Sequence, residues 1–418
     1  MKSKSTSMHV LSLTLMAGAV AAALATSAQA AENRAQRYTA GLGGSDLTSM
    51  LVPGWYGQVA MIHYHATKLK GNDGKDVSTV AGGVVPAASL AGLAAQAVVT
   101  NTSNNALLAP TATNVGTALA GTGLAYTSRL SNFRADAYVM LPRITYLSTQ
   151  KFLGAHLGFT AMLPLIERQT ALSGVTSFAN SSAVQSAIST GVLNTTGSAP
   201  LAAGVSQGVV SGVQSNVNTQ AAATLAGRSG SNAGFGDLEM APILNWEIGD
   251  HQTVTFTPTV IFPTGEYDKD LAVNPGFGKF YTFRPSVQYG FIGDGWDVGA
   301  RAVLSFNTRN TETDYRSGNM FNLDFALMKF VSEDIRLGVQ GYVVQQFSKD
   351  TSDNATEQAA IDAEGGRKMR VYGLGPALAW VVNGGEMMVE GKVIKEFNAR
   401  NRAEGATYML TVSKPFGL

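Results

Sequence analysis

Apolar side chains occur on every second residue in a series of long segments between residues 234 and 416. Leu238 and Met240, for example, alternate with Asp237 and Glu239. A period of two residues is typical of a β-strand, whose successive side chains point to opposite faces. The alternation lasts for about 10 to 13 residues. This length is close to that of a tilted membrane-spanning strand, about 9 to 11 residues, and exceeds that of an average soluble strand, about 5 to 6 residues. The pattern therefore predicts an all-β membrane barrel.

The same pattern predicts about twelve strands, with connections that alternate between long and short along the chain. Outer-membrane barrels have long outer loops, short periplasmic turns and an even number of strands. We therefore expect a closed antiparallel transmembrane β-barrel over residues 55–418, with two large loop insertions at 68–131 and 165–234. The predicted strands are 55–67, 132–146, 151–164, 237–248, 253–262, 281–291, 296–306, 321–330, 335–347, 369–382, 387–397 and 406–416.

The short connections contain residues that suit tight hairpins. Asp294 and Gly295 form one such pair, and Asn383 and Gly384 form another. These residue types supply the positive φ angles that two-residue hairpin turns require. A further short turn is predicted at residues 147–150.

The start of the chain has the features of an export signal. Lys2 and Lys4 precede an apolar run, and small residues follow it up to Ala31. We expect residues 1–30 to be a signal peptide and residues 31–54 to form a periplasmic lead-in. The predicted location is the outer membrane of a Gram-negative bacterium.

Composition excludes several classes of protein. The chain contains no cysteine, which excludes disulfides and thiolate metal sites. Loss of the two signal lysines takes the formal net charge from +1 to −1, so no electrostatic attraction for nucleic acid is expected. Beyond the signal, no apolar run approaches the about 18 residues of a membrane-spanning helix.

The two large insertions are rich in Ala, Gly, Ser and Thr. The first is predicted to contain a short Ala-rich helix at residues 87–98, and the Ser/Gln/Val rhythm of residues 204–225 also suits a helix. Local packing, a plug inside the barrel and a partner-binding arm are the three roles that these helices could have.

The last strand carries an alternating apolar ridge, Tyr408, Leu410 and Val412, which ends at Phe416. This pattern is typical of the barrel C-termini that the barrel-assembly machinery reads, although Lys414 interrupts the ridge. We expect this machinery and outer-membrane lipid to be partners of the chain.

If the apolar faces meet lipid, the other faces line the lumen. In residues 132–146 we expect Val139 and Leu141 to face outward and Tyr138 inward, whereas the first strand has apolar residues on both faces and cannot be oriented. Charges on the inner faces either pair with one another or select a solute. The candidate lumen residues are Arg134, Asp136, Asp237, Glu239, Arg284, Arg301, Asp324, Arg336, Arg370, Glu390, Lys392 and Glu396.

Catalytic and metal-binding residues are sparse. His63 and His65 share one face of a strand, but no carboxylate lies near them in sequence, so no metal site is predicted. His156 would need a serine and an acid to act as a hydrolase, and no spacing points to them. We expect no cofactor and no enzymatic activity.

Short motifs occupy the last part of the chain in a fixed order. They are Gly236-Asp237-Leu238, Phe262-Pro263-Thr264-Gly265-Glu266-Tyr267, Tyr281-Thr282-Phe283-Arg284-Pro285-Ser286, Asp314-Tyr315-Arg316-Ser317-Gly318, Gln345-Gln346 and Gly373-Leu374-Gly375-Pro376. In these motifs the chain resembles the outer-membrane transporter family named for the meta-pathway of phenol degradation. The resemblance implies an outer-membrane barrel for uptake of aromatic or other small hydrophobic solutes.

The leading hypothesis is thus a channel that passes such solutes by passive or loop-gated diffusion. The alternatives are an adhesive or structural barrel that binds partners through its long loops, and a barrel hydrolase that uses His156.

Overall fold

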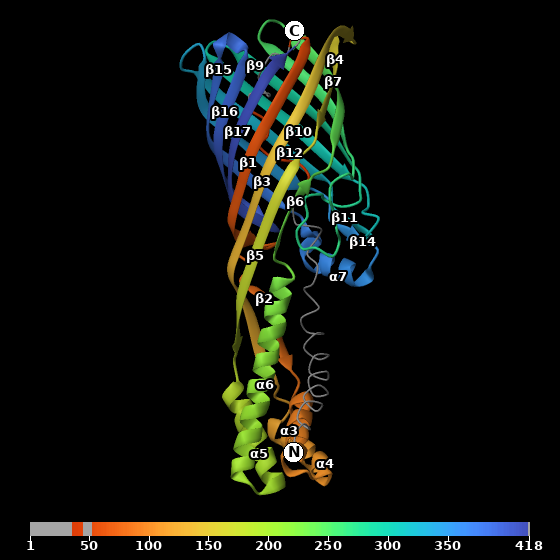
Figure 1. Ribbon diagram of the computed structural model, residues 1–418, viewed down its shortest axis with the longest axis vertical. Helices are drawn as coiled ribbons and strands as arrows, with labels where there is room; N and C mark the ends of the chain where they lie inside the picture. The colour runs from red at the N-terminus through yellow and green to blue at the C-terminus, as the bar shows by residue number, and fades with distance from the viewer. Residues whose placement is uncertain (1–35, 45–51, 417–418) are drawn as a thin grey trace, which may run out of the picture. The chain divides into compact units, whose positions relative to one another are not determined.

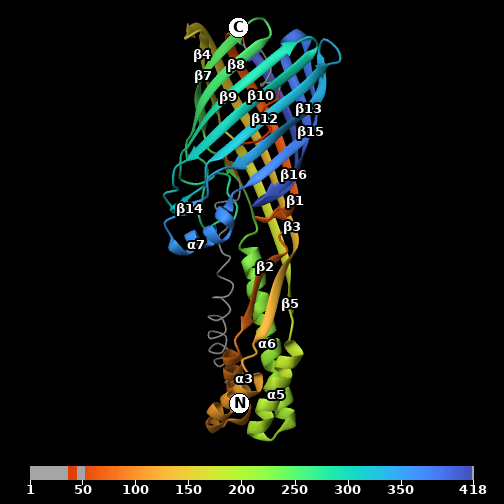
Figure 2. The same cartoon turned by 180° about the vertical axis from the view of Figure 1, so that it is seen from behind.

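The computed structural model describes residues 36–44 and 52–416. The predicted signal peptide, residues 1–30, lies outside the described residues. One large antiparallel sheet dominates the structure, and Figures 1 and 2 show it from opposite sides. Strand β1 pairs with both β17 and β3, so this sheet closes on itself.

Twelve strands of the described chain form this closed ring, which confirms the predicted barrel. Neighbouring strands are antiparallel, and the β1–β17 pairing runs from Trp55↔Phe416 to Lys70↔Arg402. The strands of the barrel are β1 (Gly54–Lys70), β3 (Leu124–Phe152), β4 (Ala155–Met162), β7 (Glu239–Ile248), β8 (Gln252–Ile261), β9 (Thr282–Gly293), β10 (Trp296–Asn307), β12 (Met320–Phe330), β13 (Ile335–Gln346), β15 (Arg370–Val382), β16 (Met387–Arg400) and β17 (Arg402–Phe416).

Two of the predicted hairpin turns have the expected backbone. Asp294 and Gly295 have φ angles of 52° and 75°, and Asn383 and Gly384 have φ angles of 49° and 66°. Both central residues of each turn are therefore left-handed, as the twist of the flanking strands requires.

The turn between β3 and β4 lies later than predicted. The prediction of a turn at 147–150 is wrong, because β3 continues through these residues to Phe152 and the chain reverses at Leu153 and Gly154. These two residues have φ angles of 50° and 79°, so the glycine sets the position of the reversal. A register shift between Leu147 and Lys151 carries the strand across the expected turn.

An aromatic cluster covers the barrel seam at the end with the short turns. Trp55 of β1 lies 4.8 Å from Tyr146, 5.6 Å from Phe159 and 6.3 Å from Phe416, measured between ring centroids. Tyr146 belongs to β3, Phe159 to β4 and Phe416 to β17, so the cluster joins four strands around the point of closure. Such rings are typical of the aromatic girdle at a membrane interface.

The two large insertions fold together into a separate compact unit that contains residues 78–132 and 172–227. Helices α3 (Ala87–Thr102) and α4 (Leu108–Leu119) come from the first insertion. Helices α5 (Ser181–Thr196) and α6 (Ala199–Ala226) come from the second. Both predicted helices are thus confirmed, while the insertions are not simple loops.

The helical unit has its own apolar core. Leu90, Val115, Ile188 and Val213, one from each helix, are fully buried within one cluster. Among the described residues, no helix is both long enough and apolar enough to cross a membrane.

We predict that Gly191→Ala destabilises this unit, whereas Gly208→Ala does not. A Cβ atom on Gly191 of α5 would lie 2.5 Å from Cα of Val115 in α4, so the two helices would have to separate. A Cβ atom on Gly208 of α6 meets nothing within 4 Å, and alanine there favours the helix by up to about 1 kcal/mol. Thermal unfolding followed by helical circular dichroism checks both variants. Equal melting temperatures of the two variants would contradict the prediction.

Smaller elements complete the described chain. Strand β5 continues from β4 beyond Pro164 and pairs with β6. The remaining elements are β2 (Thr79–Val85), η3 (Asn105–Leu107), β5 (Leu165–Phe178), β6 (Gly230–Phe235), β11 (Tyr315–Arg316), β14 (Thr351–Ser352), α7 (Ala355–Ala363), η4 (Gly365–Arg367) and η5 (Asn383–Gly385).

Candidate functional site

Residues 36–44 lie inside the barrel. They contact residues from all around the ring, from Asp237 just before β7 to Asp324 on β12 and Lys392 on β16. This part of the chain was predicted to belong to a periplasmic lead-in, and that prediction is wrong for residues 36–44. We call these residues the lumen segment.

Arg37 holds one end of the lumen segment. Its guanidinium donates hydrogen bonds to Oδ2 of Asp237 at 2.9 and 3.1 Å, to the backbone oxygen of Phe280 at 2.7 Å and to the hydroxyl of Thr282 at 2.9 Å. The same group lies 3.9 Å from the ring centroid of Phe280. Charge-assisted bonds of this kind are stronger than neutral ones.

Asp324 binds the middle of the lumen segment. Its carboxylate accepts hydrogen bonds from the Tyr38 hydroxyl at 2.5 Å and from the backbone N–H groups of Gly41 and Gly43 at 3.0 and 3.4 Å. Arg301 lies 3.7 Å from the same carboxylate. A fully buried charge thus gains several donors and a cation, as a buried carboxylate requires.

Glycines let the lumen segment approach the barrel wall. Gly41 has a φ angle of 76°, and a Cβ atom there would lie 2.9 Å from Ile394 and 3.0 Å from Tyr342. A Cβ atom on Gly44 would lie 1.9 Å from the carboxylate of Glu390. The glycine-rich run therefore fits the lumen because it has no side chains at these positions.

The lumen segment also creates an apolar region inside the barrel. Leu42 packs in one buried cluster with Ala60, Ile62, Leu141 and Met409, which lie on three different strands. A barrel filled with water would not need these inward apolar side chains. Their presence follows from the protein segment that occupies the interior.

Nine of the twelve predicted lumen residues do lie inside, and each has a partner there. Glu396 is a second centre of bonding, because it accepts hydrogen bonds from Tyr64, Tyr342 and Arg402, each at 2.8 Å. The pairs formed by the nine are Asp237–Arg37, Glu239–Arg284, Asp324–Arg301, Arg336–Asp297, Lys392–Glu390 and Glu396–Arg402.

Arg134 and Asp136 face the opposite way from the prediction. Asp136 pairs in register with His65 and lies two residues from Tyr138, which is 49% exposed on the outer face. Val139 and Leu141 point inward and, with Leu42, belong to the buried cluster inside the barrel. Both faces of this strand are apolar, so the alternation alone could not show which one meets lipid.

Arg370 is also outside the lumen. It shares the outer face of β15 with Tyr372, over whose ring it lies at 5.7 Å, and it donates a hydrogen bond to Asn398. The inward residues here are Met369 and Val371, both buried. Arg370 is the first residue of β15, and a long charged side chain at a strand end can reach solvent from the outer face. The rule that charged residues face the lumen therefore fails at this position.

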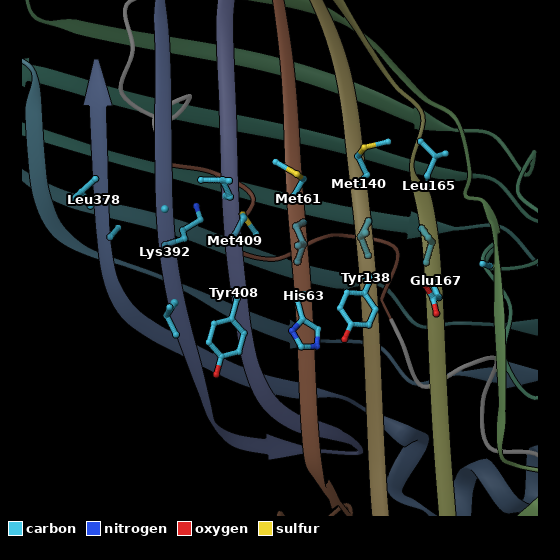
Figure 3. Close-up of a pocket in the computed structure, with 18 of the residues that line it drawn as sticks. Met61, His63, Tyr138, Met140, Leu165, Glu167, Leu378, Lys392, Tyr408 and Met409 are labelled. Atoms are coloured by element: carbon cyan, nitrogen blue, oxygen red, sulfur yellow. The ribbon is translucent and has the colours of Figure 1, made fainter. Parts of the chain in front are cut away.

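The outer face is hollowed where β1, β3, β16 and β17 pass side by side. Figure 3 shows His63, Tyr138 and Tyr408 in a row across neighbouring strands, with Met61 and Met140 beside them. The groove has a volume of about 1080 Å³ and is lined mainly by apolar side chains. It lies on the side of the wall opposite to the lumen segment.

The lumen itself holds two cavities that both reach Tyr38. The larger, of about 510 Å³, extends toward the short turns and is lined by Leu42, Phe330 and Met388 as well as several threonines. The smaller, of about 260 Å³, extends toward the long connections and is lined by Phe277 and Tyr342. The lumen segment therefore divides the interior.

These cavities are large enough for small aromatic molecules. An apolar protein cavity of about 150 Å³ already binds benzene. The larger cavity combines apolar side chains with the hydroxyls of Thr145, Thr160 and Thr257, a combination typical of small-molecule sites.

Burial alters the ionisation of the lumen segment. It raises the pKa of the Tyr38 phenol well above its usual range, with Asp324 adding to the effect. Tyr38 is therefore protonated at neutral pH and donates its hydrogen bond to Asp324. Burial also lowers the pKa of Arg37, an effect that Asp237 opposes.

His156 occupies a structural position. Its Nδ1 atom lies 3.0 Å from the backbone oxygen of Ser148, and its Nε2 atom lies 3.5 Å from Glu247. Both ring nitrogens thus face oxygen acceptors that belong to the β3–β4 hairpin and the adjacent strand β7.

Sequence reasoning missed Arg37, Tyr38, Tyr64 and Arg402, which complete the bonding inside the lumen. The glycine run that follows Tyr38 was a signal for close backbone approach. The partners of the segment could not be found from the sequence, because its polar contacts reach residues 200 or more positions away.

The family model described as "Putative MetA-pathway of phenol degradation" matches residues 110–412. The chain belongs to this family. The match covers well over half of the chain, including all of the second insertion and the last third of the first. None of the curated proteins matches the sequence.

Several solved structures are similar. An outer membrane channel from Pseudomonas putida F1 shares 12% identity, covers 90% of this chain and 100% of its own, and has a TM-score of 0.56. A FadL homologue from Pseudomonas aeruginosa shares 9% identity over 88% of this chain and 91% of its own, with a TM-score of 0.35. The CymD monoaromatic hydrocarbon channel shares 9% identity over 90% and 94%, with a TM-score of 0.36. The first of these likenesses shows a common fold.

Proposed function

We propose that this family member is an outer-membrane channel of a Gram-negative bacterium that takes up small hydrophobic or aromatic compounds. The family description refers to phenol degradation, and the Pseudomonas putida protein with the same fold is an outer membrane channel. The apolar outer faces of the strands suit contact with membrane lipid. β17 ends in the aromatic Phe416, which supports recognition of this strand by the barrel-assembly machinery.

The observation that carries the proposal is the divided lumen. Two cavities lie on either side of the lumen segment, and each contains both apolar and hydroxyl side chains. A small neutral molecule fits either cavity, and it passes between them when the segment moves. The segment is held by polar contacts at Arg37 and Tyr38, and these can re-form after passage.

The charge pattern of the lumen suits a neutral solute. The charged side chains that line the larger cavity include Glu239 and Arg284, which bond to each other, and Arg336, which bonds to Asp297. Paired charges attract an ion less strongly than a single-sign ring does. We therefore expect aromatic compounds to pass better than sugars or inorganic ions of similar size.

The proposal is tested by substitutions on two adjacent residues of β9 that face opposite ways. Ser286 lines the larger cavity, whereas Val287 is 51% exposed on the outer face. In cells that lack the chromosomal copy, a plasmid with Ser286→Trp should fail to restore uptake of labelled phenol or toluene at low external concentration. The wild type and Val287→Trp should restore it.

Membrane levels of both variants are compared by immunoblot, so that uptake is expressed per folded barrel. Equal uptake through the two tryptophan variants, or normal uptake in cells without the protein, would remove the channel hypothesis.

A further inference from the structure

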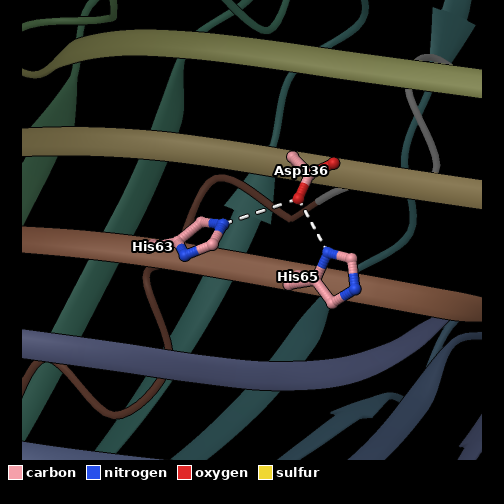
Figure 4. A group of neighbouring side chains, drawn as sticks. All are labelled: His63, His65 and Asp136. Carbon is pink, nitrogen blue, oxygen red and sulfur yellow. Dashed lines mark hydrogen bonds and ion pairs between the residues drawn. The ribbon is translucent and has the colours of Figure 1, made fainter.

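A carboxylate and two imidazoles converge on the outer face of the barrel, away from the lumen. His63 and His65 lie two residues apart on β1 and so share one face. Asp136 of β3 is the register partner of His65. Its Oδ1 atom lies 2.7 Å from Nδ1 of His65 and 3.5 Å from Nε2 of His63 (Figure 4). The three ligand atoms all lie within 4.8 Å of one another.

The surroundings hold these groups in place. The Asp136 side chain is only 2% exposed, and Nε of Arg134 binds its other oxygen, Oδ2, at 2.5 Å. Oδ1 is thereby directed at the two histidines. The Tyr138 ring stacks on His63 at 4.3 Å with an interplanar angle of 5°, which fixes the orientation of that imidazole.

The cluster of His63, His65 and Asp136 is accessible to solvent from outside the barrel. The His63 and His65 side chains are 35% and 40% exposed. An ion can therefore reach the three ligand atoms from outside the barrel and still keep a position for water. Sequence reasoning dismissed this site because no carboxylate lies near the histidines in sequence, and the β1–β3 pairing supplies one.

We propose that His63, His65 and Asp136 bind a divalent transition-metal ion of the Zn²⁺ type. Two imidazoles and one carboxylate suit Zn²⁺, Co²⁺, Ni²⁺ or Cu²⁺, whereas Mg²⁺ and Ca²⁺ favour oxygen ligands alone. Tetrahedral ligands at about 2.0 to 2.2 Å from zinc lie about 3.4 Å apart. The closest pair, at 2.7 Å, must therefore open by about 0.7 Å, which the partly exposed His65 side chain permits.

The position of the site suggests what the ion does. The β1–β3 pairing ends at Ala66↔Ala135, next to the register pair of His65 and Asp136. Beyond this point β1 continues to Lys70 beside β17 and no longer pairs with β3. An ion bound here cross-links β1 and β3 where their hydrogen bonds stop, and so stabilises the end of this strand pair. The site is independent of the proposed transport function.

Titration of the full-length barrel in detergent tests the site. After treatment with EDTA, the wild type is expected to bind one Zn²⁺ per chain by calorimetry, and Co²⁺ to give the visible absorption of a tetrahedral complex. Asp136→Asn and His65→Ala should each weaken Zn²⁺ binding at least about tenfold, since even outer partners of metal ligands matter by this factor. His251→Ala, which changes an exposed turn histidine, should bind as the wild type does.

A second measurement needs no variant and so does not depend on variant folding. Diethylpyrocarbonate modifies accessible histidines, and mass spectrometry locates the products. Zn²⁺ should protect His63 and His65 in the wild type while His251 reacts as before. Absence of Zn²⁺ binding at micromolar concentrations, or protection of His251 as much as of His63 and His65, would overturn the proposal.

Discussion

Deletion of residues 36–44 is expected to raise the single-channel conductance of the barrel several-fold in planar lipid bilayers. The segment separates cavities of about 510 and 260 Å³, and its removal joins them into one path. Small sugars, which the intact channel should pass poorly, are expected to enter proteoliposomes containing the shortened protein. Conductance that stays at the wild-type level would show that another part of the chain closes the lumen.

Substitutions within the lumen segment test its side-chain bonds while the segment itself stays in place. Arg37→Gln combined with Tyr38→Phe removes the bonds to Asp237 and Asp324 and should increase the frequency of open events. A matched control changes Arg309 and Tyr315 in the same way. These residues also bond to aspartates, Asp353 and Asp350, but lie in long connections rather than in the lumen. The control should leave conductance unchanged.

The second large effect is expected from Asp324→Ala. This substitution leaves the Tyr38 hydroxyl and two backbone N–H groups without their acceptor, and it removes the carboxylate beside Arg301, whose side chain is only 13% exposed. Breaking a buried ion pair by loss of one partner costs about 3 to 5 kcal/mol in the free energy of unfolding. Denaturant unfolding in detergent, followed by tryptophan fluorescence, measures the loss.

Three further variants, Asp324→Asn alone among them, show whether the broken ion pair causes this loss. Adding Arg301→Gln to Asp324→Asn removes both charges of this ion pair and should recover part of the stability, because replacing both partners of a buried pair costs less than removing one of them. Asp334→Asn removes an exposed carboxylate from a short turn and should change stability by no more than about 0.5 kcal/mol. A double variant less stable than Asp324→Asn alone would contradict the ion-pair explanation.

The barrel could be predicted because its signals are local. Alternation along each strand and the difference between long and short connections depend only on neighbouring residues. The ring from β1 to β17 confirms both except between β16 and β17, where the predicted long connection of residues 398–405 is wrong and the chain reverses at Asn401. The turn at Leu153 and Gly154 was misplaced because a strand can continue through polar residues such as Ser148. There the position of the glycine was the better guide.

The lumen residues were predictable only where one face of a strand is clearly polar. Glu239, Arg284 and Asp324 lie on such strands and face inward. Arg134 and Asp136 lie on a strand whose two faces are both apolar, and they face outward. The apolar inner face of that strand packs with Leu42, so its direction depends on a segment about 100 residues earlier in the chain.

The sequence by itself determined a twelve-strand antiparallel barrel, two large insertions with helices, and membership of a phenol-degradation family. Only the tertiary structure decided that residues 36–44 fill the lumen, that the insertions share one core, and that Asp136 meets His63 and His65 outside. The physical reason is the distance along the chain between the residues that interact. Periodicity and turn chemistry act between neighbours, whereas these contacts form between segments that barrel closure brings together, and no local pattern records which partner each segment meets.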